Sequence, residues 1–438
     1  AGLFLVAALW LNGLQGAALA LTGLGVAFEA GTALVNLMVT RLVGPKPLPG
    51  MSLEQGIPAE LRTLVAVPVL LADAQDLAAQ IEQLEVHYLS SVGGAVHYAL
   101  LSDGPDATEE STPPDAALIG AARAAIAALN VTYPSEGGDR FLFLHRQRRW
   151  NPAEGVWMGW ERKRGKLTEL NQLLRGAADT SFLPGPGVPD GVQFVITLDA
   201  DTRILRDTVR RLIGKMAHPL NRPVIDPVGQ RVTSGYGILQ PQVTPALPLG
   251  VDGSLYQQFS SSPGGIEPYA AACSDVYQDL FFEGSFTGKG IYHVDAFAAA
   301  LAGRVPDNTL LSHDLFEGAF ARAGLASDIH VVEDFPARQD VDARRQHRWA
   351  RGDWQLLPWI SGRRQTVGGI SAVNRWKMLD NLRRSLLAPM TMLSLFAGWL
   401  LPLPQALGWT AAVLVLLAVP RLIGLPLAVL PGRAGITA

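Results

Sequence analysis

The sequence predicts an α/β domain with a mainly parallel β-sheet, placed between transmembrane helices at both ends of the chain. Between about Leu61 and Trp359, short β-branched apolar runs alternate with helical segments, a pattern typical of an α/β domain. Charged side chains are absent near both ends of the chain, because Ala1 to Phe28 and Ser385 to Pro420 contain none. The chain is therefore predicted to be a polar body with apolar ends.

The composition also indicates a membrane protein. Of the 438 residues, 48% are hydrophobic and 17% are charged, against about 25% charged in a typical globular protein. The single cysteine, Cys273, excludes a disulfide framework and a multi-cysteine metal site, and it suits a reducing compartment. The net charge of -3 gives no basic footprint for nucleic acid, so no nucleic-acid partner is expected.

The N-terminal end is long enough to cross a membrane. As a helix, residues 1–28 would reach ~42 Å, more than the ~30 Å hydrocarbon core of a bilayer. We expect a membrane span rather than a signal peptide, because no positive segment precedes the apolar run, and we expect the chain to be part of a longer protein. Glu29 to Arg41 has a helical apolar period and is expected to lie at the interface, with a second span as the alternative.

The C-terminal end predicts two further spans. They are Leu386–Leu401 and Leu407–Leu430, separated by Pro402 and Pro404. Basic residues lie at both junctions with the body, so the positive-inside rule places the body in the cytoplasm. The predicted domains are residues 1–45 (transmembrane and interfacial helices), 46–376 (the cytoplasmic α/β body) and 377–438 (interfacial and transmembrane helices).

Within the body, five strands and three helices follow from the pattern. The predicted strands are Thr63–Leu70, His97–Leu101, Phe141–Leu144, Gln193–Leu198 and Gly237–Gln240, and the helices are Gln75–Leu89, Ala116–Leu129 and Lys166–Arg175. In a parallel sheet, ligands bind at the carboxyl ends of the strands. Functional residues are therefore sought just after each strand.

Acidic residues follow two of these strands. Asp103 ends the second strand in an Asp-Gly sequence, which is also an ordinary turn signal. Asp199 and Asp201 follow the buried run Phe194–Leu198, and two carboxylates in this spacing can hold Mg²⁺ or Mn²⁺ together with substrate phosphates. A chance Asp-x-Asp is the alternative, but its place after a strand favours the metal site.

Three further segments carry candidate chemistry. The run Glu161–Lys166 is not a Walker A motif, and it is either a solvated basic face or a set of cations at a helix start that attracts a diphosphate. Asp314 and Glu317 would share a helix face, where one of them can act as a general base. The alternative is that Ser312 or Asp314 only caps the start of the helix. From Arg344 to Gln355, arginines can grip phosphate and tryptophans can stack on a sugar, unless the segment is a membrane-proximal belt.

Together these motifs resemble a known family. Asp103, the segment from Gly165 to Asn171, Asp199-Ala-Asp201, Ser-His-Asp314 and Arg348-Trp349 occur in the order seen in membrane-embedded processive glycosyltransferases of the cellulose-synthase type, which have a GT-A fold. The runs His-Tyr-Ala-Leu-Leu-Ser-Asp and Arg-Trp-Ala-Arg-Gly-Asp-Trp-Gln are similar to the glycosyltransferase part of bacterial cyclic β-1,2-glucan synthases. The resemblance covers about Glu54 to Trp376.

The resemblance implies an inverting, metal-dependent hexosyltransferase that uses UDP-glucose to extend a β-1,2-glucan acceptor at the lipid bilayer. It assigns donor binding to Asp103, Lys166, Asp199, Asp201 and Arg348, with Asp199 and Asp201 also holding Mg²⁺ or Mn²⁺. It assigns acceptor binding to Trp349, Trp354, Glu283 and Gly284, and the general base to Asp314. It also places Gly288 and Lys289 near the floor of the acceptor and donor sites. Asp103 would contact the uridine, and Lys166 and Arg348 would balance phosphate charge.

Two positions depart from the wider family. The Gln-x-x-Arg-Trp motif has Arg345 at its first position, and His313 replaces the usual acid before the base. Glu317 is therefore an alternative base. Two other functions remain as alternatives: a membrane synthase of the same fold that makes a different polysaccharide, and a non-catalytic membrane scaffold whose carboxylates only cap helices.

Overall fold

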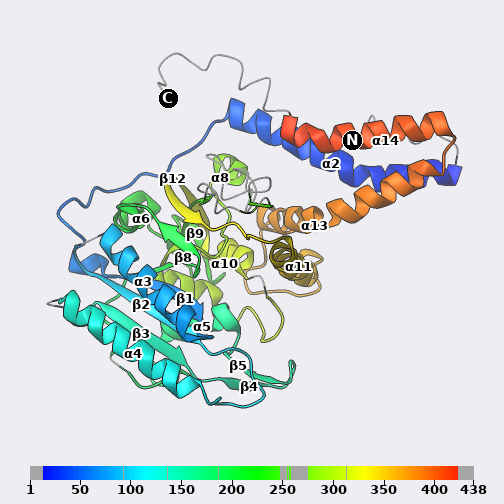
Figure 1. The fold of residues 1–438 in the computed structure, drawn as a ribbon. Coiled ribbons are helices and arrows are strands. Elements are labelled where there is room, and N and C mark those ends of the chain that lie inside the picture. The colour runs from blue at the N-terminus through cyan, green and yellow to red at the C-terminus, as the bar shows by residue number, and fades with distance from the viewer. Residues whose placement is uncertain are drawn as a thin grey trace. The chain divides into compact units, whose positions relative to one another are not determined.

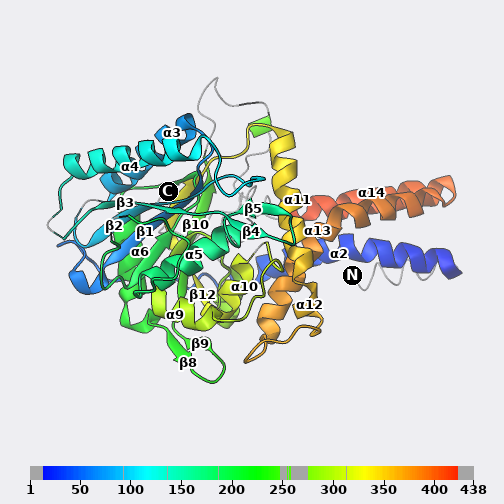
Figure 2. The same ribbon diagram turned by 90° about the horizontal axis from the view of Figure 1, so that it is seen from below.

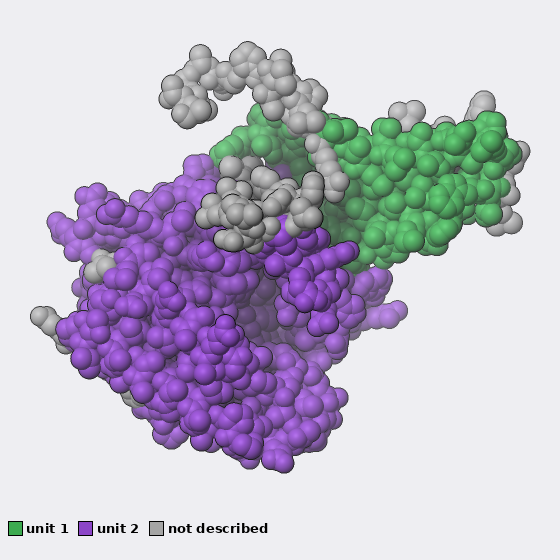
Figure 3. Space-filling view, in the orientation of Figure 1, with its two compact units in different colours: residues 1–45, 372–438 green, residues 46–371 purple. Residues whose placement is uncertain are grey.

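The computed structural model describes residues 13–91, 93–135, 137–185, 187–246, 254, 256–257, 275–311 and 313–422. The chain divides into two compact units, one formed by residues 1–45 and 372–438 and the other by residues 46–371 (Figure 3). Cys273, Ser312 and the predicted helix beyond Leu422 lie outside the described residues. The two units are considered separately.

The larger unit contains an eight-stranded sheet in the order β3-β2-β1-β6-β11-β10-β12-β7 (Figure 1). Its strands are β1 Thr63–Leu70, β2 Val96–Asp103, β3 Phe141–Arg146, β6 Phe194–Thr197, β7 Thr202–Ile204, β10 Ile238–Pro245, β11 Gly290–His293 and β12 Ala323–Glu333. The pairings make β3, β2, β1, β6, β10 and β12 point one way, whereas β11 and β7 run antiparallel to their neighbours. The α/β class with a mainly parallel sheet is thus confirmed.

Helices cover both faces of this sheet (Figure 2). The helices of the larger unit are α3 Ala74–Ser90, α4 Asp115–Thr132, α5 Arg162–Leu173, α6 Thr208–Ala217, α8 Val276–Phe281, α9 Val294–Leu301, α10 Asp314–Ala321, α11 Gln339–Gln355 and α12 Leu357–Ile360, with single 3₁₀ turns at Ala59–Leu61 and Pro219–Asn221. Apolar side chains of α3, α4 and α6 form one core with the sheet, for example Leu84, Ile126 and Leu212. On the other face, Tyr292 of β11 donates to Asn171 of α5 at 2.9 Å and stacks on Phe297 of α9.

Two short hairpins extend this sheet architecture. They are β4 Arg149–Asn151 with β5 Val156–Met158, and β8 Val224–Asp226 with β9 Arg231–Ser234. The first hairpin follows directly from the end of β3, so it stands at the carboxyl ends of the parallel strands. It is labelled beside α5 in Figure 2.

The smaller unit consists of three helices, α2 Gly13–Leu42, α13 Ala372–Trp399 and α14 Leu403–Leu422, in the part that the structure describes. The predicted boundary at Glu29 is absent, because α2 continues without interruption to Leu42. The break predicted at Pro402 and Pro404 is present, since α13 ends at Trp399 and α14 begins at Leu403. Leu19 and Val26 of α2 pack with Trp409 and Val413 of α14.

Among the residues that the structure describes, three helices are long and apolar enough to cross a membrane, by length and composition. They are Gly16–Leu42, Asp115–Thr132 and Leu403–Pro420. The second is α4, whose Ala122, Ile126 and Leu129 are buried against the sheet of the larger unit. The first and third belong to the smaller unit and match the apolar ends of the sequence.

Candidate active site

The strand directions explain why acidic residues gather at one edge of the sheet. Asp103 ends β2, Asp199 comes two residues after β6, and Glu333 ends β12. These three strands point the same way, so all three carboxylates lie at the carboxyl edge. That edge is where parallel sheets bind ligands.

The first cluster is formed by Asp199, Asp201 and Glu333. Oxygen atoms of the three carboxylates lie within 4.8 Å of one another. β7 pairs with β12 in antiparallel fashion, which sets Thr202 opposite Glu333. This pairing brings the end of β12 next to the Asp199-Ala-Asp201 turn. Clustered carboxylate oxygens are the ligands that Mg²⁺ and Mn²⁺ prefer, so the residues present fit such an ion.

Two lysines neutralise part of this first cluster. The Lys163 ammonium lies 2.5 Å from Asp199 Oδ1, and Lys289 lies 3.3 Å from Asp199 Oδ2 and also pairs with Glu333. Although burial opposes its charge, the two lysines hold the pKa of Asp199 below its usual range. Desolvation and the neighbouring Asp199 charge raise the pKa of Asp201, and the Arg345 guanidinium counteracts part of that rise. The cluster thus combines one carboxylate whose pKa is lowered with one whose pKa is raised.

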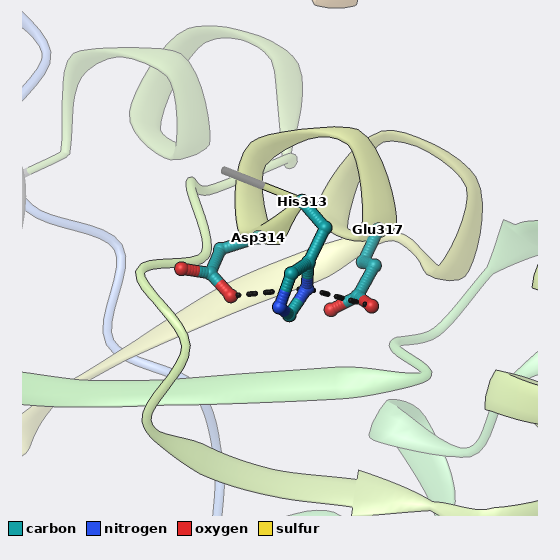
Figure 4. A group of neighbouring side chains, drawn as sticks. All are labelled: His313, Asp314 and Glu317. Carbon is teal, nitrogen blue, oxygen red and sulfur yellow. Dashed lines mark ion pairs between the residues drawn. The ribbon is translucent and has the colours of Figure 1, made fainter. Parts of the chain in front are cut away.

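The second cluster is formed by His313, Asp314 and Glu317 at the start of α10 (Figure 4). His313 Nδ1 lies 2.9 Å from Glu317 Oε1 and 3.4 Å from Asp314 Oδ1. Although burial opposes its protonation, the two carboxylates raise the pKa of His313. His313 and Glu317 are buried, whereas the Asp314 side chain keeps 28% of its exposure. Of the two acids, Asp314 is therefore the one that a substrate can reach.

The capping alternative for Asp314 is not realised in the described residues. His313 occupies the cap position and its side chain makes no capping hydrogen bond, and Asp314 is the first residue of the helix. The Asp314 carboxylate instead packs against Gly288, where an added Cβ would lie only 2.8 Å from Asp314 Oδ2. Gly288 also has a φ of +86°, which favours glycine.

Lys163 connects the two clusters. Its ammonium binds Asp199 and donates to the carbonyl oxygen of Gly288 at 2.8 Å, on the residue that packs against Asp314. Although burial opposes it, Asp199 and Asp314 together raise the pKa of Lys163. The structure therefore brings the predicted metal ligands and the predicted base to one site.

Lys166, predicted to balance phosphate charge, has all its contacts inside the larger unit. Lys166 is buried, and its ammonium is surrounded by Asp103 Oδ2 at 3.1 Å and by the carbonyl oxygens of Val69 at 2.8 Å and Leu101 at 3.2 Å. An ammonium has three protons, so no donor remains for a ligand. Burial lowers the pKa of Lys166 to about 8, against the opposing pull of Asp103. Lys163, one turn earlier, is the lysine of α5 that lies at the first cluster.

Asp103 also has a different environment from the one predicted. Its carboxylate accepts two hydrogen bonds from Arg146, at 2.8 and 2.9 Å, in addition to the contact with Lys166. Although burial opposes its charge, Lys166 and Arg146 hold the pKa of Asp103 below its usual range. Only 5% of Asp103 is exposed, so its carboxylate links β2, β3 and α5 and does not present oxygens to a uracil base.

The remaining predicted residues lie on α11 and on the chain before β11. Arg348 and Trp354 are exposed on α11, and the Trp349 ring carries the Arg345 guanidinium 4.8 Å from its centroid. Glu283 and Gly284 lie beside the start of β12, where the Gly284 amide donates to the carbonyl of Ala323 at 2.7 Å. None of these predicted residues belongs to either carboxylate cluster.

The sequence reasoning did not select Glu333 or Lys163 individually, and it named Lys289 only from the resemblance. Glu333 ends a β-branched run, Val-Val-Glu, which is the same signal that identified Asp199. Lys163 lies in the basic run Glu161–Lys166, whose pattern does not distinguish it from Lys166. Arg345, noted only as a departure, influences Asp201.

Comparison with known proteins finds relatives among glucan-synthesising transferases. Two proteins described as glucans biosynthesis glucosyltransferase H, from two strains of Rhodopseudomonas palustris, are 28% and 29% identical over 60% of this chain and 32% of theirs. No family model matches the chain.

A higher identity is found with one particular synthase. The cyclic beta-(1,2)-glucan synthase NdvB of Rhizobium meliloti is 49% identical over 414 residues, 94% of this chain, which confirms the resemblance drawn from the motifs. The chain spans 14% of the length of that protein. A solved structure, S. aureus TarS 1-349, matches 83% of this chain and 92% of its own with 10% identity and a TM-score of 0.35, too low to carry an argument.

Proposed function

We propose that the chain is the sugar-transferring part of a membrane-bound, inverting, processive glucosyltransferase that uses UDP-glucose to build β-1,2-glucan. The observation that carries this proposal is the joining of the two carboxylate clusters through Lys163, because glycosyl transfer needs a diphosphate site and a base side by side. The 49% identity to a cyclic glucan synthase supports β-1,2-glucan as the proposed product. The GT-A fold is part of the same proposal, supported by the mainly parallel sheet.

The donor diphosphate is proposed to lie between the first cluster and the cations around it. Asp199, Asp201 and Glu333 would hold Mg²⁺ or Mn²⁺, which supplies positive charge to the leaving diphosphate when bound. Lys163 and Lys289 already stand at this cluster, and Arg348 is exposed on α11 for a phosphate contact. Preorganised cations stabilise the charge that develops on the leaving group.

Asp314 is proposed to be the general base. Its carboxylate takes the proton of the attacking acceptor hydroxyl while the new bond forms to the anomeric carbon and the bond to the diphosphate breaks on the opposite face. A single base and an in-line leaving group are enough for inversion. His313 and Glu317 orient this carboxylate through the contacts at 3.4 and 2.9 Å. Trp349 and Trp354, with Glu283 and Gly284, are the proposed acceptor residues.

The flanking apolar helices support membrane attachment. Gly16–Leu42 and Leu403–Pro420 have the length and composition of spans, and basic residues lie between them and the larger unit. By the positive-inside rule, the catalytic unit lies in the cytoplasm at the bacterial inner membrane. The donor would then be taken from the cytoplasmic nucleotide-sugar pool.

The test is a transfer assay on the detergent-purified chain. Radiolabelled UDP-glucose is supplied with a linear β-1,2-oligoglucoside, with and without Mn²⁺ or Mg²⁺, and UDP release and labelled polymer are measured beside UDP-galactose and UDP-N-acetylglucosamine. We expect metal-dependent incorporation of glucose alone. Equal or better use of another sugar would point to a synthase of a different polysaccharide, and absence of UDP binding would point to a scaffold.

A further inference from the structure

The β4–β5 hairpin carries an exposed aromatic surface that the proposed mechanism does not use. Trp150 of β4 and Trp157 of β5 are directly opposite in the hairpin register, with ring centroids 6.0 Å apart. Half of Trp150 remains exposed, and Trp157 is partly exposed. Cross-strand tryptophans stabilise a hairpin by packing on each other, but this packing alone does not require so much exposed ring.

This hairpin is firmly attached to the site. Trp157 exchanges two backbone hydrogen bonds of 2.9 Å with Ala107, which follows the end of β2. Asn151 donates to the side chain of Asn308 at 2.6 Å, and Trp160 donates to Asp307 at 3.1 Å. The hairpin is thus held to the segment that leads into α10 and its Asp314.

The same segment reaches the proposed acceptor helix. The Leu311 amide donates to the Gln355 side chain at the end of α11, at 2.7 Å, next to Trp354. Asn308 has a left-handed φ of +59°, and its amide donates to Glu161 at 2.5 Å. Residues 307–311 therefore connect the tryptophan hairpin, the start of α10 and the end of α11 within one unit.

The rim of the hairpin indicates a neutral, polar ligand. Arg149, Glu154, Arg162 and Asp106 surround it with side chains that are 49%, 40%, 46% and 37% exposed, two positive and two negative. Arg162 bridges Asp106 and Glu154 at 2.9 Å each. Such a balanced rim offers hydrogen-bond donors and acceptors to hydroxyl groups, while its two acids disfavour an anionic membrane surface or a nucleic acid.

The size of the surface argues against a stable protein partner. A fully buried tryptophan covers at most about 250 Å², so one half-exposed and one partly exposed ring offer far less than the ~800 Å² per side of a typical protein interface. Two apolar rings with polar neighbours do suit the face of a pyranose ring. The ring spacing is comparable with the size of one sugar unit.

We propose that Trp150 and Trp157 form a binding site for the growing glucan, outside the acceptor site on α11. The site would retain the product between additions and guide it past residues 307–311. This inference rests on the proposed function, because it takes its ligand from it.

The first test leaves the hairpin intact. Hydroxyl-radical footprinting of the detergent-purified full chain, read by mass spectrometry, is run with and without a linear β-1,2-oligoglucoside, with exposed Leu220 as internal reference. We expect the oligoglucoside to protect Trp150 and Trp157 and to leave Leu220 unchanged. Protection by anionic lipid vesicles but not by the oligoglucoside, or no protection at all, would overturn the proposal.

The second test uses variants. Replacing both tryptophans by alanine should weaken oligoglucoside binding about tenfold, as expected from the loss of aromatic contacts worth about 1 kcal/mol or more, and shorten the polymer. Tyrosine at both positions should restore most of the affinity, and Leu220→Ala should match the parent chain. An unchanged dissociation constant and polymer length in the alanine variant would contradict the site.

Failure of this inference can be told apart from failure of the proposed function. If the parent chain turns over UDP-glucose but the tryptophan variants bind oligoglucoside normally, only this inference fails. Absence of UDP binding in the parent chain refutes the proposed function itself.

Discussion

Replacing Asp314 by asparagine is expected to lower the rate of glucose transfer by about 10²–10⁴-fold, the contribution of a positioned general base. The carboxylate is the more exposed acid of its cluster, and asparagine keeps its shape but cannot accept the proton. Nucleotide-sugar affinity should change by less than about threefold, because a base acts in the transition state. Single-turnover transfer and equilibrium UDP-glucose binding measure the two effects separately.

Two further variants make this expectation specific. Asp190→Asn removes an exposed charge from a loop of the same unit and should leave the rate unchanged. Glu317→Gln should lower the rate less than Asp314→Asn, because Glu317 is buried and acts through His313. A greater loss in Glu317→Gln, or a parallel loss of donor binding in Asp314→Asn, would assign the base elsewhere.

Replacing either of two lysines one turn apart by methionine should affect different properties: folding stability for Lys166 and UDP binding for Lys163. Lys166→Met removes a buried partner of Asp103 and leaves two carbonyl oxygens without their donor, so unfolding should become easier by about 3 kcal/mol or more. For a unit of this size that corresponds to a fall of about 4 °C or more in the melting temperature. Lys163→Met should lower the melting temperature less, since its side chain is 25% exposed and lies at the site.

The same pair of variants separates folding from binding. Lys163→Met should weaken UDP binding about tenfold or more, the effect of losing one charge-assisted hydrogen bond. Thermal unfolding by near-UV circular dichroism and UDP titration are measured on both proteins. If Lys166→Met folds normally and loses UDP affinity while Lys163→Met keeps it, Lys166 is the phosphate ligand and Lys163 is not.

Much of the sheet could be predicted because its strands are continuous apolar runs. β1 was predicted to the residue, and β2 and β3 were found within two residues at each end, since strands buried on both faces leave a clear pattern. β12 was not predicted, because Ser327, Asp328 and His330 interrupt its apolar residues. β11 has only four residues, too few for a periodic signal.

The site was predicted less completely than the sheet, and α5 shows why. The predicted helix began at Lys166, where the apolar period of Leu167 and Leu170 begins, but the helix begins at Arg162. Its first turn is polar because it faces the site, so a search for apolar periodicity excludes the functional turn. Which of two lysines in adjacent turns faces a ligand depends on the phase of the helix, and that phase is set by packing.

Non-local contacts account for the remaining differences. Glu333 joins Asp199 and Asp201 only because β12 pairs with β7, more than one hundred residues earlier in the chain. Gly288 contacts Asp314 only because β11 is inserted between β6 and β10. No local motif contains this information, although the residue types themselves were recognisable.

The anomeric configuration of the first linkage made by the purified chain tests the central claim most directly. The donor carries glucose in the α configuration, and a single base at Asp314 with an in-line leaving diphosphate must invert it. The ¹H NMR spectrum of the disaccharide unit formed from ¹³C-labelled UDP-glucose should therefore show a β-1,2 linkage. An α linkage would require a second displacement or a different geometry, and it would contradict the assignment of Asp314 as the only base.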